Sequence, residues 1–192
     1  MELPKTTEST KLHELARNID YSLRIHNVKS VVVTSDFVGE GKTALVAEVT
    51  PVLGSVYQKR VLIYDCQAPS ETGLGHTMQL RASDKAHIYR TQYPLVDYIN
   101  ETELNFLENL SDRERSHKLT DFFNDTARAY DTVMIDAKTR RSEGSSLPKL
   151  PIEGAIIVRS GKSQGKGAKK VTDELRDKEI KIIGLVLNEG IA

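Results

Sequence analysis

Residues 39–43, GEGKT, have the types and the order that bind phosphate groups. Glycines let the backbone fold tightly and point its N–H groups inward at an anion. A lysine in this place reaches the β- and γ-phosphates of a nucleotide, and the next hydroxyl can ligate Mg²⁺. The sequence therefore predicts a P-loop at 39–43, and the residue before it and the residue after it are predicted to take part in binding. The predicted nucleotide-binding residues of this loop are Val38, Gly39, Glu40, Gly41, Lys42, Thr43 and Ala44.

The residues around this motif have the pattern of a strand, a turn and a helix. Three valines, at 31–33, form an apolar β-branched run, and the sequence ALVAEV continues the motif as a helix. The start of that helix would add its partial positive charge to the site. This strand–loop–helix context gives the motif its meaning. The complete motif has glycine at its first position, where this chain has Asp36, a position that can point away from the ligand.

Two further apolar runs, RVLIYD at 60–65 and YDTVMID at 130–136, each end in an aspartate. In α/β sheets the ligand crevice lies at the carboxyl ends of the strands. Asp136 is therefore expected to hold the Mg²⁺ shell or to orient the attacking water. Asp65 is expected to bind Mg²⁺, directly or through water, or to act as a base; a structural aspartate that begins a turn is the alternative. The predicted catalytic residues are Lys42, Asp65 and Asp136, and the predicted metal ligands are Thr43, Asp65 and Asp136.

Alternating strand and helix patterns extend along the whole chain. An apolar stripe predicts a helix over 9–27. A second helix is predicted over 42–58, and Pro51 should cause a kink in it or lie near a break. Further helices are predicted over 111–129, with Ser111 as N-cap, and up to about residue 178. Strands are predicted from residue 29 and over 60–65, 130–136, 153–159 and 180–188. Segment 94–100 is predicted as a short helix, and 104–110 as either helix or strand.

This alternation predicts an α/β protein with a P-loop NTPase fold. Its mostly parallel, twisted sheet would carry helices on both faces. The length of 192 residues fits one domain over 1–192, with residues 1–9 expected to be frayed.

Composition narrows the expected partners and location. Lys and Arg total 27 and so do Asp and Glu, so no overall charge favours nucleic acid, which we do not expect as a partner. The lone Cys66 suits a reducing compartment, and no apolar run approaches the roughly 20 residues needed to span a bilayer. We therefore expect a cytoplasmic protein with no direct membrane span.

Four segments together resemble the cytoplasmic kinase domain of bacterial tyrosine kinases, which accompany capsule and exopolysaccharide synthesis and belong with the septum-site and plasmid-partition ATPases. They are VTSDFVGEGKT at 33–43, YDTVMID at 130–136, EGAIIVRSGKS at 153–163 and IIGLVLN at 182–188, and the resemblance spans 12–188. It implies ATP and Mg²⁺ as cofactors, Asp65 and Asp136 as the acids of two family motifs, and Asn188 beside the adenine. It also implies a membrane chain-length or export protein as partner, recruitment to the inner face of the membrane, and possible homo-oligomers.

Several residues depart from that family. Its Asp-x-Asp motif is Asp65-Cys66-Gln67 here, and a neutral Gln67 binds Mg²⁺ more weakly and cannot act as a base. The family's N-terminal pattern for ring assembly is reduced to Asn18, and residues 189–192 contain no tyrosine. Three functions remain open: an ATP-dependent tyrosine kinase or ATPase, a catalytically impaired nucleotide-binding regulator of a polysaccharide export complex, and a partition-type ATPase. The last class usually has a lysine where Phe37 stands.

Overall fold

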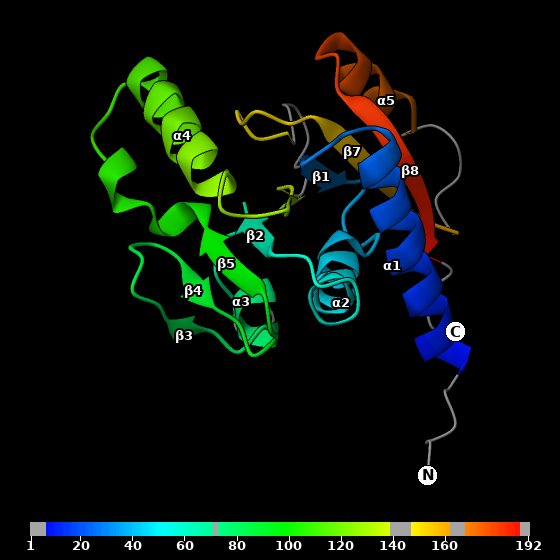
Figure 1. The fold of residues 1–192 in the computed structure, drawn as a ribbon. Helices are drawn as coiled ribbons and strands as arrows, with labels where there is room; N and C mark the ends of the chain where they lie inside the picture. The colour runs from blue at the N-terminus through cyan, green and yellow to red at the C-terminus, as the bar shows by residue number, and fades with distance from the viewer. Residues whose placement is uncertain (1–6, 71–72, 139–146, 162–167, 189–192) are drawn as a thin grey trace.

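The structure is a computed structural model, and it describes residues 7–70, 73–138, 147–161 and 168–188. Within these residues one sheet has the strand order β3-β4-β5-β2-β6-β1-β7-β8 (Figure 1). The strands are β1 Ser30–Thr34, β2 Val61–Asp65, β3 Arg81–Ala82, β4 Tyr89–Arg90, β5 Val96–Asn100, β6 Thr132–Asp136, β7 Gly154–Ser160 and β8 Lys181–Asn188. The helices are α1 Thr7–Ile25, α2 Lys42–Ser55, α3 Leu74–Thr77, α4 Asp112–Ala127 and α5 Ala168–Asp177, with two 3₁₀ turns, η1 Glu101–Glu103 and η2 Asn105–Leu107.

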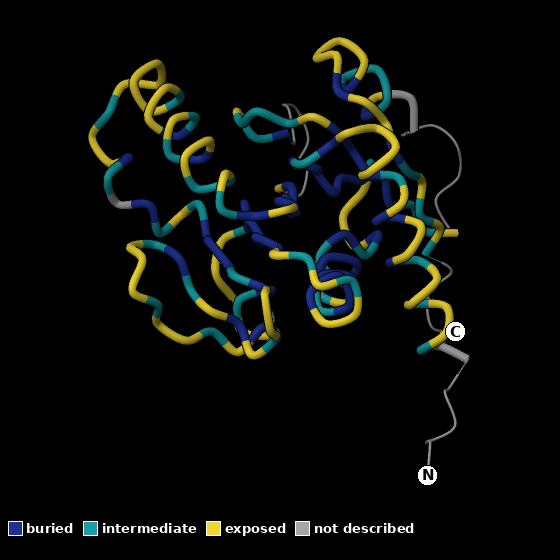
Figure 2. Tube along the Cα trace, viewed as in Figure 1, coloured by how far each residue is buried: buried dark blue, intermediate teal, exposed yellow. Residues whose placement is uncertain are grey.

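Six neighbouring strands of the sheet run parallel, in the order β5-β2-β6-β1-β7-β8. Of the strands described, only the short β4 pairs antiparallel, with its neighbours β3 and β5. Alternate residues of the central strands enter two different cores. Val31 and Val33 pack on the side of α1 and α2, whereas Val32 packs on the side of α4 and α5. Figure 2 shows the strands buried between helices whose outer faces are exposed. The predicted α/β fold, with a mostly parallel sheet covered on both faces, is confirmed.

The predicted short helix at 94–100 is wrong, because this segment contains strand β5. Val96 and Tyr98 pack into one core and Ile99 into the other, which is the two-residue alternation of a buried strand. Its β-branched and aromatic residues fit a pleated surface, and it forms a parallel ladder with β2. The ambiguous segment that follows contains the 3₁₀ turn η2 and is neither α-helix nor strand.

Helix α2 includes Pro51 and ends one turn later, at Ser55. Proline has no N–H to donate back along a helix. The hydroxyl of the preceding Thr50 donates to the carbonyl of Val46 at 2.8 Å. The expected break near Pro51 is therefore the end of the helix, three residues before the predicted limit.

Helix α4 begins with a capping box formed by Ser111 and Glu114. The Glu114 N–H donates to Ser111 Oγ, and the Ser111 N–H donates to Glu114 Oε2 at 3.1 Å. The predicted N-cap is confirmed. We expect Ser111→Ala to lower the free energy of unfolding by about 1 kcal/mol, because the Glu114 N–H loses its acceptor. Urea unfolding measures this, with Ser116→Ala inside α4 as the control; an equal effect of both substitutions would contradict the cap.

Candidate functional site

The phosphate loop lies between β1 and α2, at the carboxyl edge of the sheet. Gly39 and Gly41 have φ angles of +79° and +96°, in the left-handed region that glycine adopts readily. Gly41 is also the N-cap residue of α2, and no side chain caps the helix there. The first N–H groups of α2 therefore remain available to an anion at the positive end of the helix dipole.

Lys42, Thr43 and Asp136 come together at this loop. Strands β1 and β6 are parallel neighbours in which Val33 pairs with Asp136, so Asp136 lies next to the loop that begins after β1. The hydroxyl of Thr43 donates to Asp136 Oδ2 at 2.7 Å. Lys42 Nζ is buried and donates to Ser35 Oγ at 3.0 Å. The structure thus assembles a buried cation, a hydroxyl and a carboxylate from distant parts of the chain.

Burial disfavours the charged forms of both ionisable groups of this trio. It lowers the pKa of Lys42, although Asp136 and Glu40 oppose that effect. It raises the pKa of Asp136 to about 6, and the charge of Asp65 adds to this while the Thr43 hydroxyl and Lys42 oppose it. A bound ion of opposite charge would therefore stabilise the charged form of each group in place of the lost water.

The residues present fit Mg²⁺ and nucleotide phosphates. Asp136 Oδ1 is buried and accepts no hydrogen bond within the described part of the chain, so it is free to meet a cation. Mg²⁺ prefers carboxylate and other oxygen ligands, which Asp136 and Thr43 offer side by side. Lys42 and the start of α2 would compensate the phosphate charge.

The two other acids of the loop, Asp36 and Glu40, are engaged with neighbouring protein groups. Asp36 Oδ2 lies 3.9 Å from Arg159 Nε, and Asp36 Oδ1 accepts from the N–H of Val171 at 3.4 Å. Glu40 is 2% exposed, and its carboxylate accepts from the N–H groups of Phe37 at 2.9 Å and Ser160 at 3.3 Å. An aspartate at the first position of the motif is thus tolerated because its charge is directed toward an arginine.

The outer predicted residues of the loop take different positions. Val38 is 70% exposed at the tip, and Ala44 is exposed in the first turn of α2. Asn188, at the end of β8, donates from Nδ2 to the carbonyl of Glu40 at 3.1 Å. The last described residue of the chain therefore contacts the loop, and its side chain lies beside Gly41.

Asp65 lies between Asp136 and Asn100, its partners on β6 and β5. Its Oδ1 accepts from the N–H of Gln67 at 2.8 Å, and its Oδ2 accepts from the hydroxyl of Tyr98 at 2.7 Å. Gln67 Nε2 donates to the carbonyl of Ala137, which follows β6. Gln67 therefore joins the end of β2 to the end of β6, a contact that a carboxylate at this position could not make as a donor.

Sequence reasoning missed three residues of this site: Ser35, Tyr98 and Asn100. Ser35 is the partner of Lys42, and the other two lie beside Asp65. The apolar pattern of 94–100 is short and fits a helix or a strand, so no local signal placed Tyr98 and Asn100 beside Asp65. Arg140 and Arg141, which follow β6 in the sequence, lie outside the described residues, as does most of the lysine- and glycine-rich segment 160–170.

Gly41 should not tolerate a side chain. A Cβ at this position would lie 2.3 Å from Asn188 Nδ2, and its φ of +96° strains any other residue by about 1–2 kcal/mol. We expect Gly41→Ala to lower nucleotide affinity at least about tenfold, because the Asn188 side chain must move away and the loop backbone is strained. Calorimetry of Mg·ADP binding measures this.

Gly39→Ala is the matched control, because a Cβ there meets nothing within 4 Å at a similar φ of +79°. Its effect isolates backbone strain from the collision. Equal losses in the two variants would contradict a role for the Gly41–Asn188 contact.

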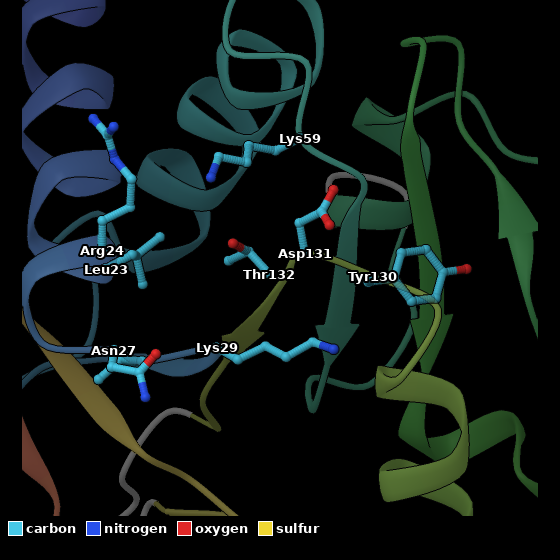
Figure 3. A pocket seen from close by; sticks show the side chains of 9 residues that line it. Leu23, Arg24, Asn27, Lys29, Lys59, Tyr130, Asp131 and Thr132 are labelled. Atoms are coloured by element: carbon cyan, nitrogen blue, oxygen red, sulfur yellow. The ribbon is translucent and has the colours of Figure 1, made fainter.

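A cavity of about 410 Å³ lies at the opposite edge of the sheet, where β1 and β6 begin. Figure 3 shows Lys29, Lys59 and Thr132 around it. Arg24 also lines this cavity. Arg24 and Lys59 each form an ion pair with Asp20, with N···O distances of 2.9 and 3.3 Å. Because the phosphate loop follows the carboxyl end of β1, this cavity is separate from the candidate site.

Comparison with known proteins agrees with the geometry. CapB of Staphylococcus aureus, named as a tyrosine-protein kinase, is 24% identical over 207 residues, which cover 97% of this chain and 86% of CapB. The tyrosine-protein kinase YwqD of Bacillus subtilis strain 168 is 22% identical over 200 residues, covering 96% of this chain and 82% of YwqD. The chain is similar to bacterial tyrosine kinases. No family model matches it.

Solved structures show the same fold. The kinase domain of the Escherichia coli tyrosine kinase ETK has a TM-score of 0.70 and 16% identity, covering 100% of this chain and 82% of that one. The septum site-determining protein MinD of Pyrococcus horikoshii OT3, solved with Mg-ADP, has a TM-score of 0.60 and 19% identity, covering 83% of this chain and 70% of MinD. The resemblance predicted from the sequence is confirmed, and the low identity marks a divergent relative.

Proposed function

We propose that this chain binds Mg·ATP at the phosphate loop and transfers the γ-phosphoryl group to a tyrosine of a partner protein or to water. The convergence of Lys42, Thr43 and Asp136 carries the proposal. Phosphoryl transfer is catalysed mainly by positioning and by neutralising charge, and bound Mg²⁺ supplies part of that neutralisation. Lys42 would hold phosphate oxygens, Thr43 and Asp136 would hold the metal, and Gly39, Glu40 and Gly41 would offer backbone N–H groups.

Asp65 is the remaining carboxylate of the site and would orient the acceptor hydroxyl or the water. The Asn188 side chain, held by the Glu40 carbonyl, would lie on the adenine side of the loop. The similarity to CapB and YwqD supports tyrosine as the protein acceptor. We further propose a membrane chain-length or export protein of a polysaccharide system as partner, which would recruit the chain to the inner face of the membrane, and assembly into homo-oligomers. None of the described helices is long and apolar enough to cross a bilayer.

The neutral, hydrogen-bonded side chain of Gln67 favours a second candidate function. In it, the chain is a nucleotide-binding regulator of such a complex that hydrolyses or transfers little phosphate. The Gln67 side-chain amide is engaged with Ala137, and neutral Gln67 cannot take a proton. A partition-type ATPase receives no such support, because Phe37 occupies the place of that class's lysine.

The test is a calorimetric titration with Mg·ATP, followed by ADP release and phosphotyrosine formation on a glutamate–tyrosine copolymer. Binding, release and phosphotyrosine together would establish the kinase. Release alone would establish an ATPase, and binding without release would establish the regulator. No binding would overturn the proposed phosphate site.

A further inference from the structure

We propose that Tyr98 and Asn100 are positioning residues that hold Asp65 so that it contacts bound Mg²⁺ through water and not directly. This inference rests on the proposed function and gives a role to β5, a strand outside the sequence motifs described above. Both residues come from β5, which lies beside β2 in the sheet.

The contact between Tyr98 and Asp65 is short and shielded from water. The phenol donates to Asp65 Oδ2 at 2.7 Å, and each residue is only 3% exposed. Asn100 Nδ2 lies 3.1 Å from the same phenol oxygen and donates to it. A phenol is protonated at neutral pH and a carboxylate is acceptor-only, so Tyr98 is the donor in its bond with Asp65. The direction of the chain of hydrogen bonds is therefore Asn100 to Tyr98 to Asp65.

Asn100 also fixes the backbone that follows Asp65. Its Nδ2 donates to the carbonyl of Gln67 at 3.0 Å, while its Oδ1 accepts from the N–H of Thr102 at 2.9 Å. Gln67 in turn donates its N–H to Asp65 Oδ1. The segment from Asp65 to Gln67 is thus held on both sides by buried polar groups, which leaves it little freedom to reorient.

These bonds determine how Asp65 can meet a cation. Each of its oxygens already accepts from a protein donor, whereas Asp136 Oδ1 accepts from none of the described residues. Each Asp65 oxygen keeps a second lone pair, so a metal-bound water can donate to it while the bonds from Gln67 and Tyr98 stay in place. Direct coordination would draw the carboxylate toward the cation and strain those bonds, which a water-mediated contact avoids. Residues that orient ligands in this way typically change metal affinity by about 10- to 100-fold when removed.

The experiment compares Tyr98→Phe with Tyr130→Phe. Tyr130 is the matched control, because its buried phenol also donates to an aspartate, Asp97 Oδ2, at 2.8 Å, but away from the loop. Affinity for ADP is measured by calorimetry with Mg²⁺ at several concentrations and with EDTA. We expect Tyr98→Phe to weaken the apparent Mg²⁺ affinity about tenfold and to leave ADP binding in EDTA unchanged. Tyr130→Phe should change neither.

A double-mutant cycle with Asp65→Asn separates positioning from general loss of stability. Because Tyr98 acts through Asp65, adding Tyr98→Phe to Asp65→Asn should cause no further loss of Mg²⁺ affinity. Additive losses, or identical behaviour of the Tyr98 and Tyr130 variants, would overturn the inference while leaving the proposed function intact. Failure of the wild-type chain to bind ADP in any condition would instead overturn the proposed function. Catalysis is not needed for either result.

Discussion

Lys42→Met is expected to lower the affinity for Mg·ATP by about 100-fold or more. The Lys42 amine is buried beside Ser35 at the start of α2, where phosphate oxygens would replace the lost water. Charge-assisted bonds of this kind contribute about 1.5–3 kcal/mol each, and removing one partner of a buried charge pair costs about 2–5 kcal/mol. Calorimetry with Mg·ATP measures the change.

The same substitution should leave the fold intact. Burial lowers the pKa of Lys42, so its charged form is costly in the free protein, and methionine fills a similar volume without that cost. Thermal unfolding should therefore show an unchanged or higher midpoint. Lys118→Met, on the exposed side of α4, is the control and should change neither property. Nucleotide affinity that survives in the Lys42 variant would refute the phosphate site.

Asp136→Asn is expected to stabilise the free protein at neutral pH while greatly reducing its response to Mg²⁺. Burial raises the pKa of Asp136 from 3.8 to about 6. The folded state thus holds a proton that the unfolded state has released, and stability falls as pH rises between these values. The penalty is fully present above pH 6 and absent below pH 4. Removing it should add about 2–3 kcal/mol to the free energy of unfolding at pH 7.5.

Chemical unfolding at pH 7.5 and pH 4 measures this effect. The amide oxygen that replaces the carboxylate in this variant can still accept from the Thr43 hydroxyl, so the loop should keep its geometry. A variant less stable than the wild type at pH 7.5 would contradict the assigned burial cost.

The same carboxyl should make Mg²⁺-dependent binding sensitive to pH. Mg²⁺ needs the charged carboxylate, so affinity for Mg·ADP should be full above about pH 7 and decline up to tenfold per pH unit below about pH 6. Titrations at pH 5.0, 6.0 and 7.5 measure the decline, and Asp136→Asn should abolish most of it. A wild-type affinity that is constant over this range would show that Asp136 does not hold the metal.

The local parts of this protein could be predicted from its residues alone. The spacing of Gly39, Gly41, Lys42 and Thr43 predicted the phosphate loop, because neighbouring residues set its backbone and the helix that follows. Runs of β-branched residues ending in aspartate predicted β2 and β6. The cap at Ser111 also depends only on residues three apart.

Which distant side chains meet depends instead on how the strands are ordered in space. Strand β5 is a strand because β2 and β4 lie on either side of it, and its short apolar pattern fits helix and strand alike. The order of strands then brings Tyr98 to Asp65, Gln67 to Ala137 and Asp136 to Thr43. These contacts span large separations in sequence, and a hydrogen bond between such residues depends on sheet order and register, which local propensity does not encode.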